Sequence, residues 1–170
     1  MASIPRIGID AMGGDHGPEV VVQGVCLALR ETPGRFSVTL IGDENVVRPA
    51  LHRAGAEGLG VDVVHAAETI DMAEKAAAAA RRKSTSSIAV MAQLHKEGKV
   101  DAIFSAGNTG AVVATALLSL GRLESVSRPA LAAFFPNAAG GCVVLDVGAN
   151  ASCKASYLVQ FAHMGAVYAR

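Results

Sequence analysis

The stretch RIGIDAMGGDHGPEVVVQGVCLAL, residues 6–29, decides the fold of the chain. Residues 6–10 form a short apolar run that is typical of a buried strand, and Gly13 and Gly14 follow it as a turn. Pro18 then suits the first turn of a helix, where the N–H that proline lacks is not needed. The helix carries a single apolar stripe, the pattern of a surface that faces a core. The stripe consists of Val21, Val22, Val25, Cys26 and Leu29.

The same alternation of strand and helix continues along the chain. Further apolar runs predict strands at 36–42, 61–65, 101–105, 130–135 and 142–146. Helices are expected from the Asp43 cap to about Ala54, at 72–82, from the break at 84–87 to Gly98, from the glycine-rich loop at 107–110 to Leu120, and at 153–170. Strands that alternate with helices imply parallel strands covered on both faces. The sequence therefore predicts an α/β fold with a doubly wound, mostly parallel, Rossmann-like sheet.

The overall composition indicates a globular chain without a strong electric field. The 170 residues fit one domain, and 51% of them are hydrophobic. Fifteen basic residues balance fifteen acidic ones, which gives no preference for nucleic acid or for an anionic membrane. Aromatic residues make up only 4% of the chain, too few to suggest a platform for stacking bases. No nucleic-acid partner is expected.

Cysteine and histidine usage indicates a reducing compartment and no metal. Cys26, Cys142 and Cys153 are odd in number and form no C-x-x-C, so a disulfide framework is not expected. The five histidines show no metal-ligand spacing with one another or with the cysteines. The uncharged stretch 102–121 carries polar side chains, so a buried strand, a loop and a core helix explain it better than a membrane span. We expect a soluble protein of a reducing compartment, without metal or cofactor.

The end of the chain lies inside a helical pattern. Residues 168–170 carry no capping signal. The sequence also shows no internal repeat and no interdomain linker. We therefore expect residues 1–170 to be the N-terminal part of a single Rossmann-like domain that is truncated at its C-terminus.

Three loops are the candidates for chemistry, because ligands bind beyond the carboxyl ends of strands in open α/β sheets. They are residues 10–16, 105–110 and 146–150. The loop 105–110 consists of small residues before a helix, so backbone N–H groups and the helix dipole predict an anion site. It matches neither the P-loop nor the ordinary dinucleotide fingerprint. A tight turn is the alternative, with Asn108 or Thr109 either capping the helix or binding a phosphate oxygen.

The loop after the first strand places a carboxylate and an imidazole on a flexible turn. Asp15 and His16 suit substrate positioning or proton transfer near neutral pH. In the alternative, Asp15 caps the helix that begins near Pro18, and His16 is solvated.

Charged residues at strand ends need partners. Asp10 and Asp146 each end an apolar strand, where a charge is costly unless it is partnered. We expect both to hold loops through backbone N–H groups or to orient a cation. Lys154 is the best-placed cation for an anionic substrate, although a lone lysine is usually solvated. His16 and Lys154 are the two candidates for a catalytic role.

Four segments together resemble one known family. They are Ile7–Pro18, Glu68–Met72, Ser105–Ala111 and Leu145–Asn150. Their order and spacing resemble the phosphate acyltransferase family of bacterial phospholipid synthesis across essentially the whole chain. The resemblance implies a fold similar to isocitrate dehydrogenases and phosphate acetyltransferases. It also implies transfer of a fatty acyl group from acyl carrier protein to inorganic phosphate, giving acyl phosphate.

The resemblance further implies partners and a location. Family members are cytoplasmic homodimers that can associate peripherally with the membrane. They are about twice as long as this chain, and the missing half is expected to carry dimer contacts, the membrane-touching element and part of the cleft. The resemblance transfers a binding site, not a catalytic residue. The residues assigned to substrate or phosphate binding are Gly13, Gly14, Asp15, Ser105, Gly107, Asn108, Thr109, Gly110, Asp146 and Asn150.

This chemistry suits a site without a catalytic triad. A thioester expels a thiolate whose conjugate acid has a pKa near ~8.5, so little acid assistance is needed. Phosphate is already substantially dianionic near neutral pH and needs no separate activating base. The protein has to hold phosphate against the carbonyl and to offset charge on the developing oxyanion.

Three alternatives to this function remain open. One is a phosphate acetyltransferase-like enzyme that uses acyl-CoA. Another is an inactive half-domain that only binds a partner. A dehydrogenase is less favoured, because the dinucleotide fingerprint is missing.

Overall fold

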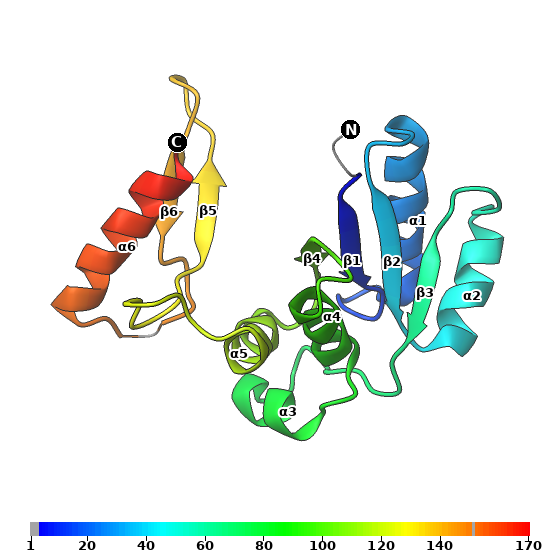
Figure 1. Cartoon of the computed structure of the whole chain (residues 1–170), viewed down its shortest axis with the longest axis horizontal. Coiled ribbons are helices and arrows are strands. Elements are labelled where there is room, and N and C mark those ends of the chain that lie inside the picture. Colours follow the sequence, from blue (N-terminus) through cyan, green and yellow to red (C-terminus); the bar gives the residue numbers. More distant parts are fainter. Residues whose placement is uncertain (1–3, 151) are drawn as a thin grey trace. The chain divides into compact units, whose positions relative to one another are not determined.

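The structure is a computed structural model that describes residues 4–150 and 152–170. These residues form two compact units, one up to Leu120 and one from Gly121 to Arg170, and each is described by itself. Figure 1 labels the elements in chain order. The first unit contains β1 (Arg6–Asp10), α1 (Gly17–Glu31), β2 (Ser37–Gly42), α2 (Glu44–Arg53), β3 (Asp62–His65), α3 (Ala76–Arg82), α4 (Ser87–Lys96), β4 (Ala102–Phe104) and α5 (Thr109–Ser119). The second contains β5 (Ala132–Phe135), β6 (Cys142–Leu145) and α6 (Ala155–Tyr168).

The first unit is built on a parallel sheet of four strands in the order β3-β2-β1-β4. Strand β1 lies inside the sheet, where Ile9 is aligned with Leu40 of β2 on one side and with Phe104 of β4 on the other. All three strand pairs are parallel. Because β1 and β4 are parallel neighbours, their carboxyl ends and the loops that follow lie side by side.

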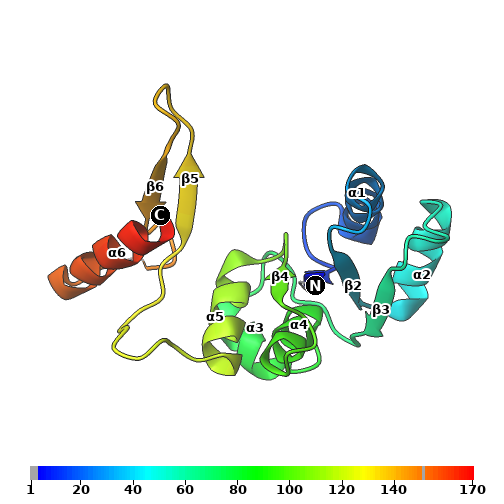
Figure 2. The ribbon, with the colours of Figure 1, turned by 45° about the horizontal axis from the view of Figure 1, so that its top comes forward.

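Helices cover both faces of this sheet. Neighbouring residues of β2 point to opposite faces: Leu40 packs with α1 and α2, and Ile41 packs with α3, α4 and α5. Figures 1 and 2 show α1 and α2 on one face and α4 on the other. The predicted doubly wound, Rossmann-like α/β fold is confirmed, and the cores of its two faces explain why the strands are apolar on both sides.

Local signals in the sequence explain where several helices begin. Pro18 lies in the first turn of α1, and Cys26 is buried on the predicted apolar stripe. The Asp43 carboxylate accepts the N–H of Asn45 at 3.0 Å and caps α2, as expected. Ser86 caps α4 by accepting the N–H of Ala89 at 3.3 Å.

The predicted helix 72–82 is wrong in its first turn, because α3 begins only at Ala76. The Asp71 carboxylate accepts the N–H of Ala73 at 2.8 Å, which forms a local turn. The carbonyl groups of Asp71, Met72 and Glu74 accept hydrogen bonds from the Asn108 side chain. These carbonyls therefore point toward α5 and do not continue a helix.

The second unit is an antiparallel hairpin of β5 and β6 together with α6. Phe161 of α6 is buried, and α6 contacts β6. The expectation that these two strands are parallel is wrong. Only residues 136–141 connect them, whereas parallel strands need a crossover of a dozen or more residues.

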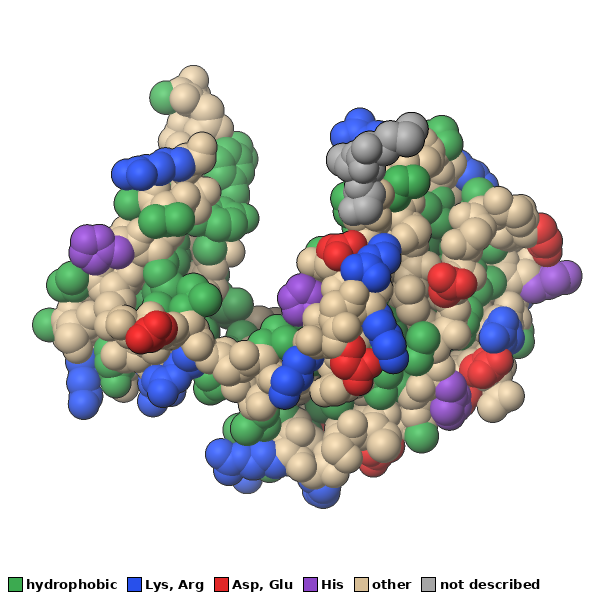
Figure 3. All heavy atoms as spheres, in the orientation of Figure 1, with side chains coloured by type: hydrophobic (Ala, Val, Ile, Leu, Met, Phe, Trp, Pro, Cys, Tyr) green, Lys and Arg blue, Asp and Glu red, His purple; other side chains and the backbone are tan. Residues whose placement is uncertain are grey.

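The surface has mixed charge. Figure 3 shows acidic and basic side chains interspersed on the face in view, which agrees with the net charge of zero. Among the described residues, no helix has both the length and the apolar character needed to cross a bilayer.

Candidate functional site

The loops after β1 and β4 meet through two glycines. A Cβ on Gly13 would lie 2.7 Å from Gly107 N and 2.9 Å from Gly107 Cα. Real Cβ atoms do not come this close to other heavy atoms, so the two backbones can touch only because neither residue has a side chain at this point. Two of the three predicted loops are therefore in direct backbone contact.

A buried carboxylate organises this contact. The side chain of Asp10 is 1% exposed, and its Oδ2 accepts the hydroxyl of Ser105 at 2.7 Å. Its Oδ1 accepts the N–H of Met12 at 3.1 Å. The Ser105 hydroxyl in turn accepts the N–H of Gly107 at 3.0 Å. The expected loop-holding role of Asp10 is confirmed, and the only proton of the Ser105 hydroxyl is already used inside the protein.

Asn108 joins three segments of the first unit. Its Oδ1 accepts the N–H of Ala111 at 3.0 Å and so caps α5. Its Nδ2 donates to the carbonyls of Met72 and Glu74 at 3.1 Å and to that of Asp71 at 3.3 Å. The residue is only 9% exposed. The structure therefore supports the capping alternative, because both polar groups of this side chain are engaged within the chain.

The first turn of α5 keeps main-chain donors available. Within the described residues, the N–H groups of Asn108, Thr109 and Gly110 have no acceptor, whereas that of Ala111 is capped. Thr109 and Gly110 are exposed. These N–H groups and the helix dipole give the turn a partial positive charge, which suits an anion. The anion site at this turn stays a prediction, and the side chains of Ser105 and Asn108 bind within the chain instead of facing this turn's free donors.

Gly110 also has a packing role. A Cβ at this position would lie 2.8 Å from Cβ of Ala76, the first residue of α3. The start of α3 thus packs directly against the start of α5. This contact supports the first turn of α5 in addition to the glycine contact with the β1 loop.

The turn that precedes α1 is open to solvent. Asp15 and His16 are exposed, and Gly14 adopts a positive φ of 97°. The expectation that Asp15 caps α1 is wrong: His16 occupies the N-cap position, and its side chain makes no capping hydrogen bond. If Asp15 were the N-cap, the helix would begin at residue 16. It begins instead at Gly17, which has a positive φ of 64°. His16 is solvated, as in the simpler of the two alternatives.

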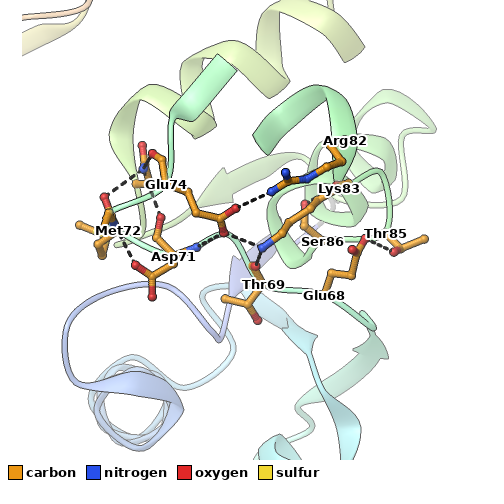
Figure 4. Close-up of polar contacts among 11 residues, drawn as sticks. Glu68, Thr69, Asp71, Met72, Glu74, Arg82, Lys83, Thr85 and Ser86 are labelled. Carbon is orange, nitrogen blue, oxygen red and sulfur yellow. Dashed lines mark hydrogen bonds and ion pairs between the residues drawn. The ribbon is translucent and has the colours of Figure 1, made fainter. Parts of the chain in front are cut away.

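The segment before α3 is held by an ion-pair network that sequence analysis missed (Figure 4). The Glu74 carboxylate binds Lys83 Nζ at 2.5 Å and Arg82 Nη2 at 3.0 Å. Lys83 also donates to the Thr69 carbonyl at 2.7 Å. The hydrogen bond from Lys83, followed by that from the N–H of Asp71, lowers the pKa of Glu74. Arg82 and Lys83 at the end of α3 therefore hold the segment before it, and the family-like segment 68–72 was the available signal in the sequence.

The third loop belongs to the second unit. Asp146 Oδ1 accepts the N–H of Leu131 at 2.9 Å and of Ala149 at 3.1 Å, and its Oδ2 accepts Asn150 N and Nδ2, both at 2.8 Å. Partial burial alone would raise the pKa of Asp146, but these hydrogen bonds outweigh it and lower the pKa. Asn150 Nδ2 also donates to the Pro129 carbonyl at 3.0 Å. The expected loop-holding role of Asp146 is confirmed, with Asn150 as its partner.

The remaining candidates are exposed. Lys154 lies at the N-cap position of α6 without a capping hydrogen bond, and Cys153 is an exposed free thiol. Among the residues that the structure describes, no group of three or more potential ligands is arranged to hold a metal ion.

Comparison with known proteins now identifies the family. Residues 5–170 match the model of a family described as "Fatty acid synthesis protein". The chain belongs to this family. Curated proteins named phosphate acyltransferase are similar to nearly all of the chain, so the fatty acid synthesis family includes close relatives with an enzymatic name.

Three of these relatives show the extent of the similarity. The protein from Pelotomaculum thermopropionicum is 47% identical over 165 residues, which are 97% of this chain and 47% of the relative. Those from Myxococcus xanthus and Geobacter sulfurreducens are 48% and 46% identical, and each match also covers 97% of this chain and 47% of the relative. The chain thus spans about half the length of these members of the fatty acid synthesis family.

Proposed function

We propose that this chain is part of a phosphate acyltransferase that moves a fatty acyl group from a carrier thioester to inorganic phosphate. The supporting observation is the first turn of α5, where the N–H groups of Asn108, Thr109 and Gly110 have no acceptor among the described residues. Relatives that carry the name phosphate acyltransferase make phosphate the anion to propose here.

The proposed reaction needs positioning more than proton transfer. A phosphate oxygen attacks the thioester carbonyl carbon, the C–S bond breaks, and the sulfur leaves as a thiolate while a C–O bond forms. Main-chain N–H groups at 108–110 bind the attacking phosphate and lower its repulsion from the developing oxyanion. Thiolates are good leaving groups, so a general acid is not required.

The glycine-rich turn contributes shape to this proposal. Gly13 allows the β1 loop to lie against the β4 loop, and Gly13 and Gly14 are proposed to take part in substrate binding beside the start of α5. Asp15 and His16 are exposed and are proposed to contact the acyl donor. In the second unit, Asp146, Asn150 and Lys154 are proposed to belong to the substrate site of the whole protein.

Acyl carrier protein is the proposed donor, and the whole protein is proposed to be a cytoplasmic homodimer with peripheral membrane contact. The family description and the relatives' names support an acyl substrate in lipid synthesis. An enzyme that uses acyl-CoA is the second candidate. Acyl phosphate formation from each donor, trapped with hydroxylamine, separates the two.

The main-chain anion site can be tested at one position. Thr109 is the first residue of α5, where proline is tolerated, and Asn108 has φ of −57° and ψ of 106°, an extended conformation compatible with a following proline. Thr109→Pro removes one N–H donor, whereas Thr109→Ala removes only the side chain. The assay uses the 170-residue chain and a version extended with the second half of the Pelotomaculum thermopropionicum relative.

The two variants are expected to differ in their KM for phosphate. Thr109→Pro is expected to raise the KM for phosphate about tenfold or more, and Thr109→Ala to change it by less than about threefold. Equal phosphate KM values for the wild type and Thr109→Pro would refute the main-chain site. The absence of acyl phosphate in both forms of the protein, with either donor, would refute the proposed reaction.

A further inference from the structure

The Ser105 hydroxyl is the middle of a chain of hydrogen bonds that begins at a buried charge. It donates to Asp10 Oδ2 at 2.7 Å and accepts the N–H of Gly107 at 3.0 Å. Asp10 is 1% exposed and lies 95 residues before Ser105 in the sequence. No cationic side chain among the described residues pairs with Asp10, so its charge depends on hydrogen-bond donors and this pair is costly to disturb.

The chain of hydrogen bonds ends at the turn that presents the anion-binding groups. Gly107 is buried and lies directly before Asn108, the cap of α5. A Cβ on Gly107 would lie 3.1 Å from Ser105 Oγ, 3.3 Å from Asp10 Oδ2 and 3.3 Å from Gly13 Cα. Atoms of three residues thus crowd the position that a Cβ of Gly107 would take, and the Ser105 hydroxyl binds its N–H, so the Gly107 peptide has little freedom to turn.

We infer that Asp10 and Ser105 are positioning residues for the anion site, and that neither of them is an anion ligand. Asp10 holds the Ser105 hydroxyl, the hydroxyl holds the Gly107 peptide, and that peptide aims the N–H groups of residues 108–110 at the anion. This inference rests on the proposed function, because inorganic phosphate is taken as the anion. It gives Ser105, one of the residues assigned to phosphate binding, an indirect part in that binding.

The Ser105 hydroxyl also reduces the electrostatic effect of Asp10 on the proposed anion site. A carboxylate near an anion site repels the anion, unless hydrogen-bond donors around the carboxylate offset its charge. Both oxygens of Asp10 accept hydrogen bonds, one from Met12 in the loop after β1 and one from Ser105 in the loop after β4. Ser105 lies between the carboxylate and the start of α5, and its dipole, with hydrogen toward Asp10 and oxygen toward Gly107 N–H, satisfies both neighbours.

The chain offers a closely matched control for Ser105. Ser86 is also a serine whose hydroxyl donates one hydrogen bond, to the Lys83 carbonyl at 2.8 Å, and accepts one, from Ala89 N at 3.3 Å. It is fully buried and caps α4, not α5. Ser86→Ala and Ser105→Ala therefore remove the same chemical group with the same number of hydrogen bonds.

Titration of the ¹⁵N-labelled 170-residue chain with inorganic phosphate tests the inference without requiring turnover. In the wild type, the amide signals of residues 108–110 are expected to shift with saturable binding. Ser105→Ala is expected to weaken this binding about tenfold or more, and Ser86→Ala to change it less than about twofold. Ser105→Thr, which keeps the hydroxyl, is expected to stay within about threefold of the wild type.

Each result decides for or against the inference. Equal phosphate affinity in the wild type and Ser105→Ala, equal losses in Ser105→Ala and Ser86→Ala, or equal losses in Ser105→Ala and Ser105→Thr would overturn it. So would phosphate-induced shifts confined to residues away from 108–110, or no shifts.

The proposed function can fail separately. Ser105-dependent phosphate binding without acyl transfer would leave the positioning role in place and remove the reaction. Acyl transfer in which Ser105→Ala has the phosphate KM of the wild type would do the reverse.

Discussion

The backbones of Gly13 and Gly107 are in direct contact, and the Asp10 carboxylate lies beside both of them. The contact joins the loops after two neighbouring strands. A Cβ on Gly13 would come within 2.7 Å of both Gly107 N and Asp10 Oδ2. Neither a backbone nor a buried, hydrogen-bonded carboxylate can move aside at low cost.

Gly13→Ala is therefore expected to destabilise the protein. The added methyl forces the two loops apart, and overpacking of this kind costs about 1–3 kcal/mol. Urea unfolding followed by circular dichroism measures the change. An unfolding midpoint identical to that of the wild type would show that the loops separate freely.

Gly24→Ala is expected to have the opposite effect. Gly24 lies inside α1, and a Cβ there would meet no atom within 4 Å. Alanine lowers the entropy cost of forming the helix, so stability should rise by about 0.5–1 kcal/mol. The same urea experiment measures this rise, and a fall in stability would mean that the position is packed against something.

Asn108→Asp is expected to destabilise the protein although aspartate caps helices as well as asparagine does. The new carboxylate would face the carbonyls of Met72 and Glu74, which now accept hydrogen bonds from Nδ2. We expect a loss of about 2 kcal/mol or more in the free energy of unfolding. Asp43→Asn at the cap of α2 is the control and should change stability by less than about 0.5 kcal/mol. Similar values for the two variants would mean that the contacts with residues 71–74 contribute nothing.

The ion pair between Asp101 and Arg6 predicts a loss of stability in acid. Hydrogen bonds from the Arg6 side chain, followed by that from its N–H, lower the pKa of Asp101 from 3.8 to about 2. A lowered folded-state pKa means that the stabilisation is fully present above about pH 4 and is lost as the pH falls toward 2. The difference in urea midpoint between the wild type and Asp101→Asn should therefore shrink over this range. Both side chains are 47% exposed, so the difference is expected to be small at high salt. A difference that stays constant from pH 6 to pH 2.5 would contradict this assignment.

Most of the first unit could be predicted from the sequence because local patterns determine it. Pro18 and Asp43 lie where helices begin, and apolar runs such as 37–42 form strands that are buried on both faces. Strand direction in the hairpin was not predictable from residue types. An apolar pattern is the same whether a strand is parallel or antiparallel to its neighbour. The length of the connection decides the direction, and the six residues 136–141 are too few for a parallel crossover.

The loop proposed as the anion site was predicted from its small residues, but the hydrogen-bond partners of its side chains could not be. Ser105 and Asn108 have the residue types of anion ligands, yet their partners are Asp10 and the segment 71–74, which are distant in the sequence. The start of α3 was misplaced partly for the same reason, because carbonyls before this helix bind Asn108, which is more than thirty residues away. Contacts between distant segments are absent from any local pattern.

The exposed amides at the start of α5 also have a consequence for how this protein can change over generations. The proposed site is made of main-chain N–H groups, so it depends on the conformation of the backbone. Most substitutions of the surrounding side chains therefore leave its hydrogen-bond donors unchanged. Its vulnerable points are the residues that have no side chain to vary. The ligand preference of the proposed site is thus expected to be insensitive to most side-chain changes, and sensitive to replacement of a glycine where the two loops touch.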